Sequence, residues 1–371
     1  MIIIWLVCGA IASNETAVWQ NINNAKVGVW TGIQYNSHMK VLIFSADEAA
    51  RSILSPVLMG HTAVFFDEIV SLHALKENSD AEAVSIFTSS EFKKEQIDAL
   101  PNLKCISTRS TGYDHIDTAY AKEKGIVVCN VPRYGAKTVA EFTFALILTL
   151  SRRIFEAFHQ VREEGSFKTS ALEGFNLFGK TLGVVGTGNI GRNVVGIAKG
   201  FGMKVLMMDP YPDNKLEDEQ AKYAPLDELL AGSDIVTLHV PYTKENRYLL
   251  NKDSFAKMKR GAFIINTARG ELVDTEALLD ALKSGQVAGA GLDVLEEERV
   301  LKDEVELVKG IESMNELKIL IRDHALIDMP RVVITPHIAF FSREACHEIL
   351  EVTAANITGF VAGKPTNIVA S

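Results

Sequence analysis

Residues 183–209, GVVGTGNIGRNVVGIAKGFGMKVLMMD, carry the clearest structural signal in the 371-residue chain. The apolar start predicts a buried strand, a Gly-x-Gly-x-x-Gly turn follows at once, and residues 192–201 have the pattern of a helix. A glycine turn between a strand and a helix N-terminus is the arrangement that binds a pyrophosphate group. The stretch therefore predicts the first β-α-β unit of a dinucleotide-binding domain.

Each glycine of this turn has a predicted task, and an acid follows at the expected distance. Gly186 permits the tight turn, Gly188 lets the backbone approach the pyrophosphate, and Gly191 lets the helix pack closely on the strand. Asp209 ends the next apolar run, where an acid accepts hydrogen bonds from the adenosine ribose. Its carboxylate would repel a 2'-phosphate, and no arginine follows it closely, so the predicted cofactor is NAD and not NADP.

Short β-branched runs alternate with amphipathic stretches from Met39 onward, which indicates two α/β units with parallel sheets. An apolar helix, expected at 139–153, separates them and favours a subunit contact. Residues 299–330 predict a charged helical insertion, and 342–363 a helix. The strands are expected at 41–44, 63–66, 83–87, 104–108 and 127–130, then at 182–185, 204–208, 235–239, 262–266, 289–294 and 332–335.

Composition excludes several classes of protein. The chain is 47% hydrophobic and 23% charged, as in soluble globular proteins, and its length favours two domains. A net charge of -9 argues against a nucleic-acid partner. The four cysteines are scattered and no metal-ligand spacing occurs, which predicts no metal site and a reducing, cytoplasmic location. The apolar run 139–150 is too short to span a membrane.

The N-terminus permits two interpretations. Residues 2–12 are apolar and end in small residues, as a signal peptide does. No basic region precedes them, however, and the first strand follows directly after a second methionine, Met39. We therefore interpret residues 1–38 as an upstream extension or a mis-assigned start, with a secretion or membrane signal as the alternative.

Side chains suited to acid–base and anion chemistry follow three of the predicted strands, at the sheet edge where ligands bind in α/β folds. Arg269 follows one strand, acids at 293 and 296–298 follow the next, and His337 follows the last. Arginine offers a planar fork of donors to a 2-keto acid, and histidine is the side chain that titrates closest to neutrality. Taken singly, either residue could equally be structural.

The motifs GTGNIG, NTARG, GLDVLEEE and TPHIAFF, in this order, resemble the D-2-hydroxyacid dehydrogenases, and the resemblance runs from Met39 to the C-terminus. It implies an α/β fold with a Rossmann NAD-binding domain, residues 137–336, inserted into a flavodoxin-like catalytic domain, residues 39–136 and 337–371. It also implies a homodimer. The expected NAD contacts are Gly186, Gly188, Asn189, Ile190, Gly191, Asp209, Pro210, His239, Val240, Pro241, Thr267, Ala268 and Asp293.

The same resemblance assigns catalytic roles. Arg269 would hold the substrate carboxylate and carbonyl oxygen, and His337 would be the acid/base. Glu298 would pair with His337 and keep it protonated for reduction, whereas Glu296 and Glu297 are expected to be solvated. Asp293 matches a family acid that modulates this site.

Further residues are expected to bind the substrate. The amides of Thr111 and Gly112 would grip its carboxylate, although the loop 109–114 also reads as a simple strand-to-helix turn. Tyr134, Phe340 and Phe341 match aromatic positions of the D-lactate dehydrogenase branch. Their bulk predicts a small substrate such as pyruvate, while the hydroxyl-rich run 108–111 leaves room for a longer or more polar one.

Three alternatives remain open at this point. Another branch, such as a glyoxylate, hydroxypyruvate or phosphoglycerate dehydrogenase, would carry the same motifs. Formate dehydrogenases fit poorly because they lack a glutamate at the position of Glu298. A non-catalytic, NAD-sensing co-repressor would share the fold, although no additional recognition module is evident.

Overall fold

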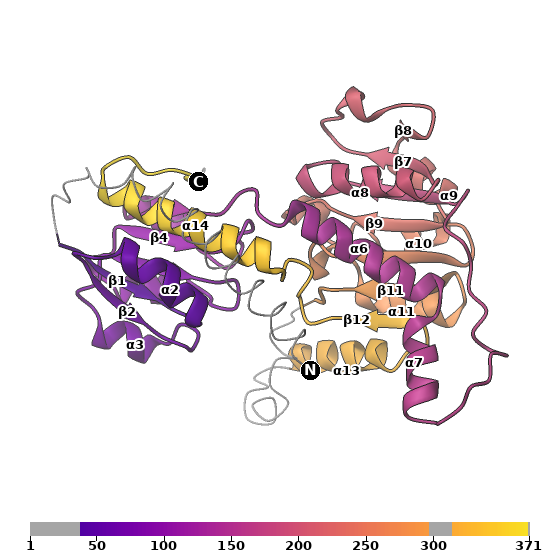
Figure 1. Cartoon of the computed structure of the whole chain (residues 1–371), viewed down its shortest axis with the longest axis horizontal. Helices are drawn as coiled ribbons and strands as arrows, with labels where there is room; N and C mark the ends of the chain where they lie inside the picture. The colour runs from indigo at the N-terminus through magenta and orange to yellow at the C-terminus, as the bar shows by residue number, and fades with distance from the viewer. Residues whose placement is uncertain (1–37, 297–313, 370–371) are drawn as a thin grey trace, which may run out of the picture. The chain divides into compact units, whose positions relative to one another are not determined.

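The computed structural model describes residues 38–296 and 314–369, which divide into two compact units (Figure 1). One unit consists of the chain up to Asn130 together with Leu350–Ser371, and the other is Val131–Ile349. The predicted N-terminal extension lies outside the described residues except for His38. Among the helices that the structure describes, none is long and apolar enough to cross a bilayer.

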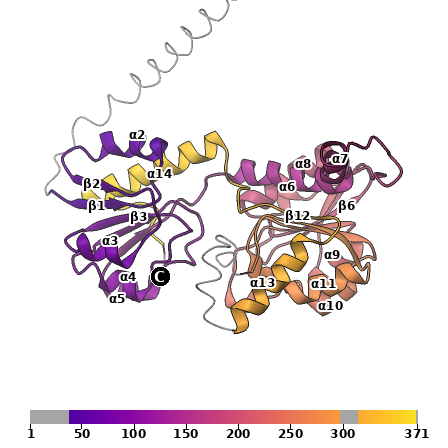
Figure 2. The ribbon, with the colours of Figure 1, turned by 90° about the horizontal axis from the view of Figure 1, so that it is seen from below.

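The first unit is built on a parallel sheet of five strands in the order β2-β1-β3-β4-β5. This is the strand order of the flavodoxin-like fold, so that part of the predicted fold class is confirmed. Figure 2 shows α2 and α14 on one face of the sheet and α3, α4 and α5 on the other. The elements are β1 Lys40–Ile43, α2 Glu48–Val57, β2 Thr62–Phe65, α3 Leu72–Glu77, β3 Ala83–Ile86, α4 Lys94–Asp98, β4 Cys105–Thr108, α5 Thr118–Glu123, β5 Val127–Cys129 and α14 Arg343–Val361.

Strand β1 shows why these apolar runs become central strands. Successive side chains of a strand point to opposite faces, and here Val41 and Ile43 enter one hydrophobic cluster while Leu42 enters the other. All three are fully buried. The later half of α14 contributes Leu350 and Ile357 to the same cluster as Val41, which is how the end of the chain returns to the first sheet.

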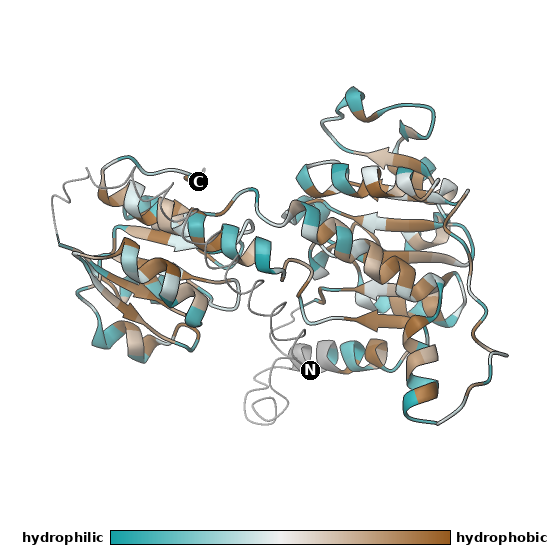
Figure 3. Ribbon diagram, in the orientation of Figure 1, coloured by the Kyte–Doolittle hydropathy of each residue, from teal (hydrophilic) through white to brown (hydrophobic). Residues whose placement is uncertain are grey.

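The second unit contains a parallel sheet of seven strands in the order β12-β11-β10-β9-β6-β7-β8. Strands β8-β7-β6-β9-β10-β11 follow the Rossmann order, with β12 added at the edge, which confirms the predicted class. Figure 2 shows α6 and α8 on one face and α9, α10, α11 and α13 on the other, and Figure 3 shows the strands as predominantly hydrophobic.

The elements of the second unit are α6 Ala136–Ser151, α7 Ile154–Arg162, β6 Thr181–Val185, α8 Asn189–Gly200, β7 Lys204–Met208, β8 Ala221–Tyr223, α9 Leu226–Gly232, β9 Ile235–Leu238, α10 Lys252–Lys257, β10 Ala262–Asn266, α11 Thr275–Lys283, β11 Val287–Leu292, α13 Met314–Ile327 and β12 Val332–Ile334. Every predicted strand is present with its bounds within two residues. The edge strand β8 and the helix α7 were not predicted. The early part of the predicted helical insertion lies outside the described residues.

Helix α6 packs against its own unit, as its apolar circumference predicts. Phe144, Leu146, Ile147 and Leu150 are buried in a cluster with side chains of α8 and β10. The expectation that this helix is buried against a domain is therefore confirmed. Its contact with a second subunit stays a prediction.

Candidate active site

The glycine turn between β6 and α8 cannot be built with larger residues at two of its three glycines. Gly186 has a φ of 94°, and a Cβ there would lie 2.7 Å from the carbonyl carbon of His239. A Cβ on Gly191 would lie 1.9 Å from the carbonyl oxygen of Gly186. Gly188 is different, because a Cβ there would meet nothing within 4 Å. Gly188, the middle glycine of the turn, therefore borders open space.

Helix α8 begins at this open space. Its N-cap is Gly188, and no side chain caps the helix. The first N–H groups of a helix have no partner within it, and the helix dipole adds positive potential there. An uncapped helix start beside an unobstructed glycine fits the pyrophosphate of NAD.

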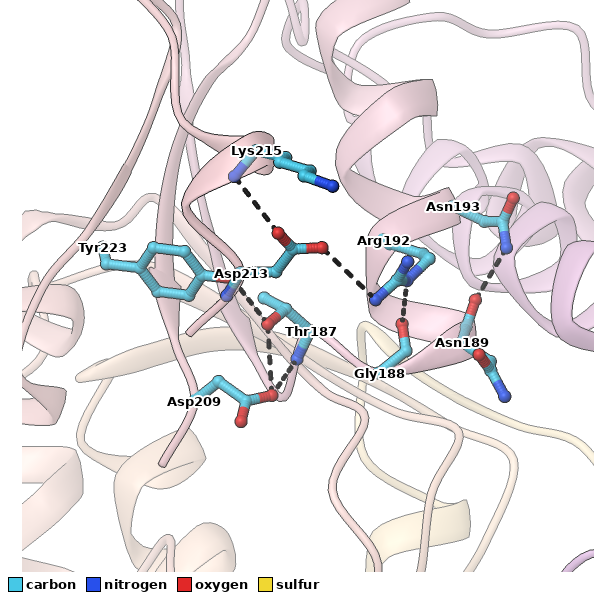
Figure 4. A network of polar contacts seen from close by, with 9 residues as sticks. All are labelled: Thr187, Gly188, Asn189, Arg192, Asn193, Asp209, Asp213, Lys215 and Tyr223. Atoms are coloured by element: carbon cyan, nitrogen blue, oxygen red, sulfur yellow. Dashed lines mark hydrogen bonds and ion pairs between the residues drawn. The ribbon is translucent and has the colours of Figure 1, made fainter. Parts of the chain in front are cut away.

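Asp209, directly after β7, is held by the glycine turn (Figure 4). Its Oδ2 accepts hydrogen bonds from the main-chain N–H of Thr187 at 2.7 Å and from its hydroxyl at 3.1 Å, and its Oδ1 accepts one from the N–H of Tyr211 at 2.8 Å. A carboxylate has about four acceptor positions, so one remains for a ribose hydroxyl. Tyr223 of the unpredicted strand β8 extends this network, with its hydroxyl 2.8 Å from that of Thr187.

A cation also lies near this network. The Arg192 guanidinium is 3.8 Å from a carboxylate oxygen of Asp213, and its Nε donates to the carbonyl of Gly188 at 3.3 Å (Figure 4). Arg192 precedes Asp209 in the chain by 17 positions. The absence of an arginine shortly after Asp209 in the sequence therefore gives no indication of this cation.

His239 follows β9, next to the glycine turn, and it is half-buried. Its Nε2 lies 2.9 Å from the hydroxyl of Thr237. Desolvation lowers the pKa of this histidine to about 3, so the ring is neutral near pH 7. Val240 and Pro241 continue from it at the carboxyl edge of the sheet, between β6 and β10. That edge is the switch point at which open α/β sheets bind ligands.

Arg269 is positioned by the residue that ends β10. The side-chain amide of Asn266 donates to the carbonyl of Arg269 at 2.8 Å, and its oxygen accepts from the N–H of Ala268 at 3.0 Å. Thr267, between them, has its hydroxyl 3.1 Å from that of Thr143 on α6. The turn that delivers Arg269 is thus fixed from two sides.

Asp293, after β11, anchors the turn that carries His337. Its Oδ1 accepts from the hydroxyl of Thr335 at 2.5 Å and from the N–H of Ile338 at 3.0 Å, and its Oδ2 accepts from the N–H of Ala339 at 2.9 Å. Burial raises the pKa of Asp293, against these hydrogen bonds and the charge of His337. The sequence predicts that Asp293 contacts NAD and modulates the acid/base site. The geometry adds that Asp293 positions the turn that carries His337.

One aromatic ring packs near the His337 imidazole, and a cluster of aromatic rings extends from it. The ring of Phe340 lies 6.5 Å from it, centroid to centroid, and meets it nearly edge to face. Tyr134 stands edge to face on Phe340 at 6.1 Å. Phe341 differs from the expectation that both phenylalanines close the pocket, because its side chain is 67% exposed. Its ring nevertheless meets that of Phe340 at 5.8 Å, so Phe340 contacts His337 while Tyr134 and Phe341 both pack on Phe340.

The acidic residues after Asp293 differ from prediction. Glu298 and Glu297 lie outside the described residues. Glu296, expected to be solvated, is only 5% exposed and accepts hydrogen bonds from Tyr248, Arg247 and Thr275. Three donors compensate its burial, and a run of three glutamates gives no sign of which one turns inward.

The predicted substrate loop belongs to the first unit, after β4, and is held by its own hydroxyl groups. The Thr108 hydroxyl lies 2.7 Å from that of Ser110, which donates to the carbonyl of Gly112 at 2.6 Å. Asn130 donates to the carbonyl of Thr111 at 2.8 Å. Thr108 and Ser110 are buried, so their hydroxyls maintain the loop and are not held in reserve for a polar substrate.

Arg109, within the same loop, was not predicted to have a role. Its buried guanidinium donates to the carbonyl oxygens of Phe44 and Ser45 at the end of β1. Desolvation lowers the pKa of Arg109 to about 10, so the side chain stays charged at neutral pH. The side chain ties the loop to the end of β1, which is separated from β4 by β3 in the sheet. In residues 38–296 and 314–369, no group of three or more histidine, cysteine or acidic side chains could hold a metal ion.

Comparisons with known proteins agree with this arrangement. Residues 144–339 match the family model of the D-isomer specific 2-hydroxyacid dehydrogenase NAD-binding domain. A 2-hydroxyacid dehydrogenase homolog of Haemophilus influenzae is 38% identical over 88% of this chain and 97% of its own length. A glyoxylate reductase of Korarchaeum cryptofilum is 37% identical over 78% of this chain and 83% of its own.

A solved structure gives the same result. The D-lactate dehydrogenase of Aquifex aeolicus, complexed with NAD and lactic acid, superposes with a TM-score of 0.78 at 38% identity, covering 87% of this chain and 96% of that one. The glycine turn fits NAD, the two sheets have the expected strand orders, and the sequence matches extend over both units. This chain belongs to the D-isomer specific 2-hydroxyacid dehydrogenases, a family of NAD-dependent oxidoreductases that act on CH–OH groups.

Proposed function

We propose that this protein reduces a small 2-keto acid to the D-2-hydroxy acid, with pyruvate and D-lactate as the substrate pair. One observation carries the proposal: the turn that carries His337 is held by Asp293, and the His337 imidazole has the ring of Phe340 near it. An acid/base group beside bulky aromatic side chains suits a substrate with a short side chain.

The proposed chemistry uses two side chains of the second unit. Bound NADH would supply a hydride to the carbonyl carbon. Arg269 holds the carboxylate and the carbonyl oxygen with charge-assisted hydrogen bonds, which also polarise the C=O bond. His337 donates a proton to the carbonyl oxygen as the C–H bond forms, so the ketone becomes an alcohol and the histidine becomes neutral. Glu298 favours the protonated histidine before each turnover.

The first unit contributes the amides of Thr111 and Gly112, which grip the substrate carboxylate. The hydroxyl chain from Thr108 to Gly112 supports this role, because it fixes a loop whose tip remains accessible. The Aquifex aeolicus relative was solved with lactic acid bound, which favours pyruvate as the substrate here. The glyoxylate reductase among the relatives favours a second candidate, glyoxylate or hydroxypyruvate.

NADH oxidation tests the proposal against pyruvate, 2-ketobutyrate, phenylpyruvate, glyoxylate and hydroxypyruvate, with chiral analysis of the product. We expect the highest kcat/KM for pyruvate and a D-product. A preference for glyoxylate or hydroxypyruvate would replace the substrate and keep the reaction class. An L-product would contradict the stereochemistry.

We also propose that the protein is a homodimer, and that α7 contributes to the contact. Large apolar side chains are exposed on this helix: Ile154 at 52%, Phe155 at 56% and Phe158 at 57%. Monomeric soluble proteins rarely expose such contiguous patches. Sedimentation should show a dimer for the wild type and a monomer for Phe155→Asp/Phe158→Asp. A monomeric wild type would remove the proposal.

A cytoplasmic location is the remaining proposal. Cys105 and Cys129 lie on the adjoining strands β4 and β5 and are free. Thiols so placed stay reduced in a reducing compartment. Fractionation of the native cells, with mass spectrometry of the N-terminus, tests this.

A further inference from the structure

Three segments of the second unit that lie far apart in the chain meet at the buried carboxylate of Glu296. Its Oε1 accepts hydrogen bonds from the Tyr248 hydroxyl and, at 3.2 Å, from the Arg247 guanidinium. Its Oε2 accepts one from the Thr275 hydroxyl at 3.3 Å. A buried carboxylate is costly unless donors compensate it, and this one has three.

Tyr248 makes a second connection through its backbone. Its main-chain N–H donates to the carbonyl of Glu271 at 2.9 Å, two residues after Arg269. The chain then runs alongside the Arg269 loop, because the N–H of Leu250 donates to the carbonyl of Leu272 at 3.0 Å. Tyr248 is therefore joined to the Arg269 loop by its backbone and to Glu296 by its side chain.

The conformation of Tyr248 shows that this arrangement is imposed. Its φ is 53°, in the left-handed region that residues with a side chain seldom occupy. Such a conformation persists only where surrounding contacts hold it. The Arg247 guanidinium, 4.7 Å from the centre of the Tyr248 ring, also donates to its hydroxyl at 3.0 Å. Desolvation, followed by the hydrogen bond to Glu296, raises the pKa of Tyr248, so the phenol remains a donor.

The Arg269 loop also rests directly on the chain at Glu296. A Cβ on Gly270 would lie 2.1 Å from the carbonyl carbon of Leu295 and 2.4 Å from the nitrogen of Glu296. The backbone after Arg269 is thus in contact with the backbone at Glu296. Any shift of Glu296 must move the loop, because no side chain at position 270 lies between them.

We infer that Tyr248 and Glu296 are positioning residues that set the place of Arg269 for the substrate. The Tyr248 hydroxyl binds the Glu296 carboxylate, and the Tyr248 main-chain N–H binds the carbonyl of Glu271. At Gly270 the backbone of the Arg269 loop lies directly against the backbone at Glu296. Neither side chain touches the substrate. This inference rests on the proposed function, in which Arg269 binds the carboxylate of a 2-keto acid.

Tyr248→Phe tests the inference, because it removes only the hydroxyl. We expect the KM for pyruvate to rise about 10-fold or more, since small displacements of a positioning group have large kinetic effects. The Kd of NADH, measured by fluorescence, should stay within about twofold of wild type. A purely structural role would lower the thermal midpoint and leave the KM of the folded enzyme unchanged.

A second pair of variants tests the other end of the contact. Glu296→Gln keeps an oxygen that can accept the Tyr248 hydroxyl, so it should retain most of the activity that Glu296→Ala loses. Glu276→Gln is the matched control, because this carboxylate sits next to Thr275 and its side chain is 65% exposed. The control should have wild-type kinetics. Equal kinetics in Glu296→Gln and Glu296→Ala would overturn the inference.

Hydrogen exchange separates failure of this inference from failure of the proposed function. Amides of residues 270–273 should exchange faster in Tyr248→Phe than in wild type, whatever the substrate is. If the wild-type enzyme reduces no 2-keto acid, the proposed function fails and exchange alone decides whether Tyr248 holds the loop. If folded Tyr248→Phe shows wild-type hydrogen exchange at residues 270–273 and a wild-type KM, the inference is wrong.

Discussion

The main-chain N–H of His337 donates a hydrogen bond to the carbonyl oxygen of Asp293 at 2.9 Å, and the Asp293 carboxylate accepts from the two residues that follow His337. His337 itself has a φ of 55°. A left-handed conformation costs roughly 1–2 kcal/mol for a residue with a side chain. The hydrogen bonds to Asp293 offset this cost and hold the backbone that carries the proposed acid/base.

Asp293→Asn should therefore impair catalysis more than cofactor binding. The asparagine NH2 group faces a main-chain N–H where the carboxylate accepted one, so a hydrogen bond is lost and the turn relaxes. We expect kcat to fall about 10- to 100-fold with pyruvate, and the NADH affinity to fall less than kcat does. Asp280→Asn, an exposed acid on α11, is the control. Unchanged kcat in Asp293→Asn would show that the turn needs no anchor.

Two neighbouring glycines should respond in opposite ways to alanine. Gly188→Ala meets open space, so the apoprotein should fold normally, but the methyl group would occupy the place of the pyrophosphate and weaken NADH binding about 10-fold or more. Gly191→Ala collides with the backbone and should lose several kcal/mol of stability, on the order of an overpacked core. Thermal unfolding and NADH titration measure both. Tight NADH binding by Gly188→Ala would contradict the proposed pyrophosphate site.

Asp209→Ala should narrow the preference for NADH over NADPH. Removing the carboxylate takes away a charge-assisted hydrogen bond to the ribose, worth about 1.5–3 kcal/mol, or roughly 10- to 100-fold in NADH affinity. It also removes the repulsion of a 2'-phosphate. Asp218→Asn, in the same connection between β7 and β8, should change neither affinity. An unaltered cofactor ratio in Asp209→Ala would count against the assignment.

His337→Ala distinguishes an enzyme from an NAD-sensing binding protein. Loss of a general acid lowers turnover by roughly 10² to 10⁴. Binding of NADH should persist, because the glycine turn is untouched. Steady-state kinetics and NADH fluorescence on the same sample report both quantities. If turnover survives, His337 is not the proton donor.

His239 makes stability depend on pH in a calculable direction. Its folded-state pKa, about 3, lies below the ordinary value of 6.5, so between these two values only the unfolded chain takes up the proton. Stability is therefore lost as the pH falls below 6.5, by about 2 kcal/mol at pH 5. Urea denaturation at pH 7.5 and pH 5 should show a smaller difference for His239→Asn than for wild type. His73→Asn, on the exposed surface, should leave the wild-type difference intact.

Much of this fold is readable from local sequence, because long apolar runs and the glycine turn impose their structure locally. The strand β8 escapes prediction because it is three residues long and its middle residue, Lys222, is exposed. Helix α7 has apolar side chains at 154, 155, 158 and 161, the spacing of one helix face, so the sequence does carry the signal for it.

The site is less readable where contacts join distant segments. The catalytic motifs can be recognised singly, but the bonds from Asp293 to Ile338 and Ala339 span more than 40 positions. Glu296 and Tyr248 are 48 positions apart, and no periodicity links them. The hydroxyls of Thr108 and Ser110 leave room for a polar substrate when only the sequence is considered. In the structure they bond within the loop, and the folded shape of the loop decides those partners.

The order of strands in the second sheet places β9 between two groups of residues. On one side, β6 and β7 lead into the glycine turn and Asp209, and on the other, β10, β11 and β12 lead into Arg269, Asp293 and His337. Under the proposed roles, one half of the sheet serves the nucleotide and the other serves the reacting acid. Such a division makes the protein modular in evolution: substrate preference can drift through substitutions on one half while the nucleotide half is inherited unchanged.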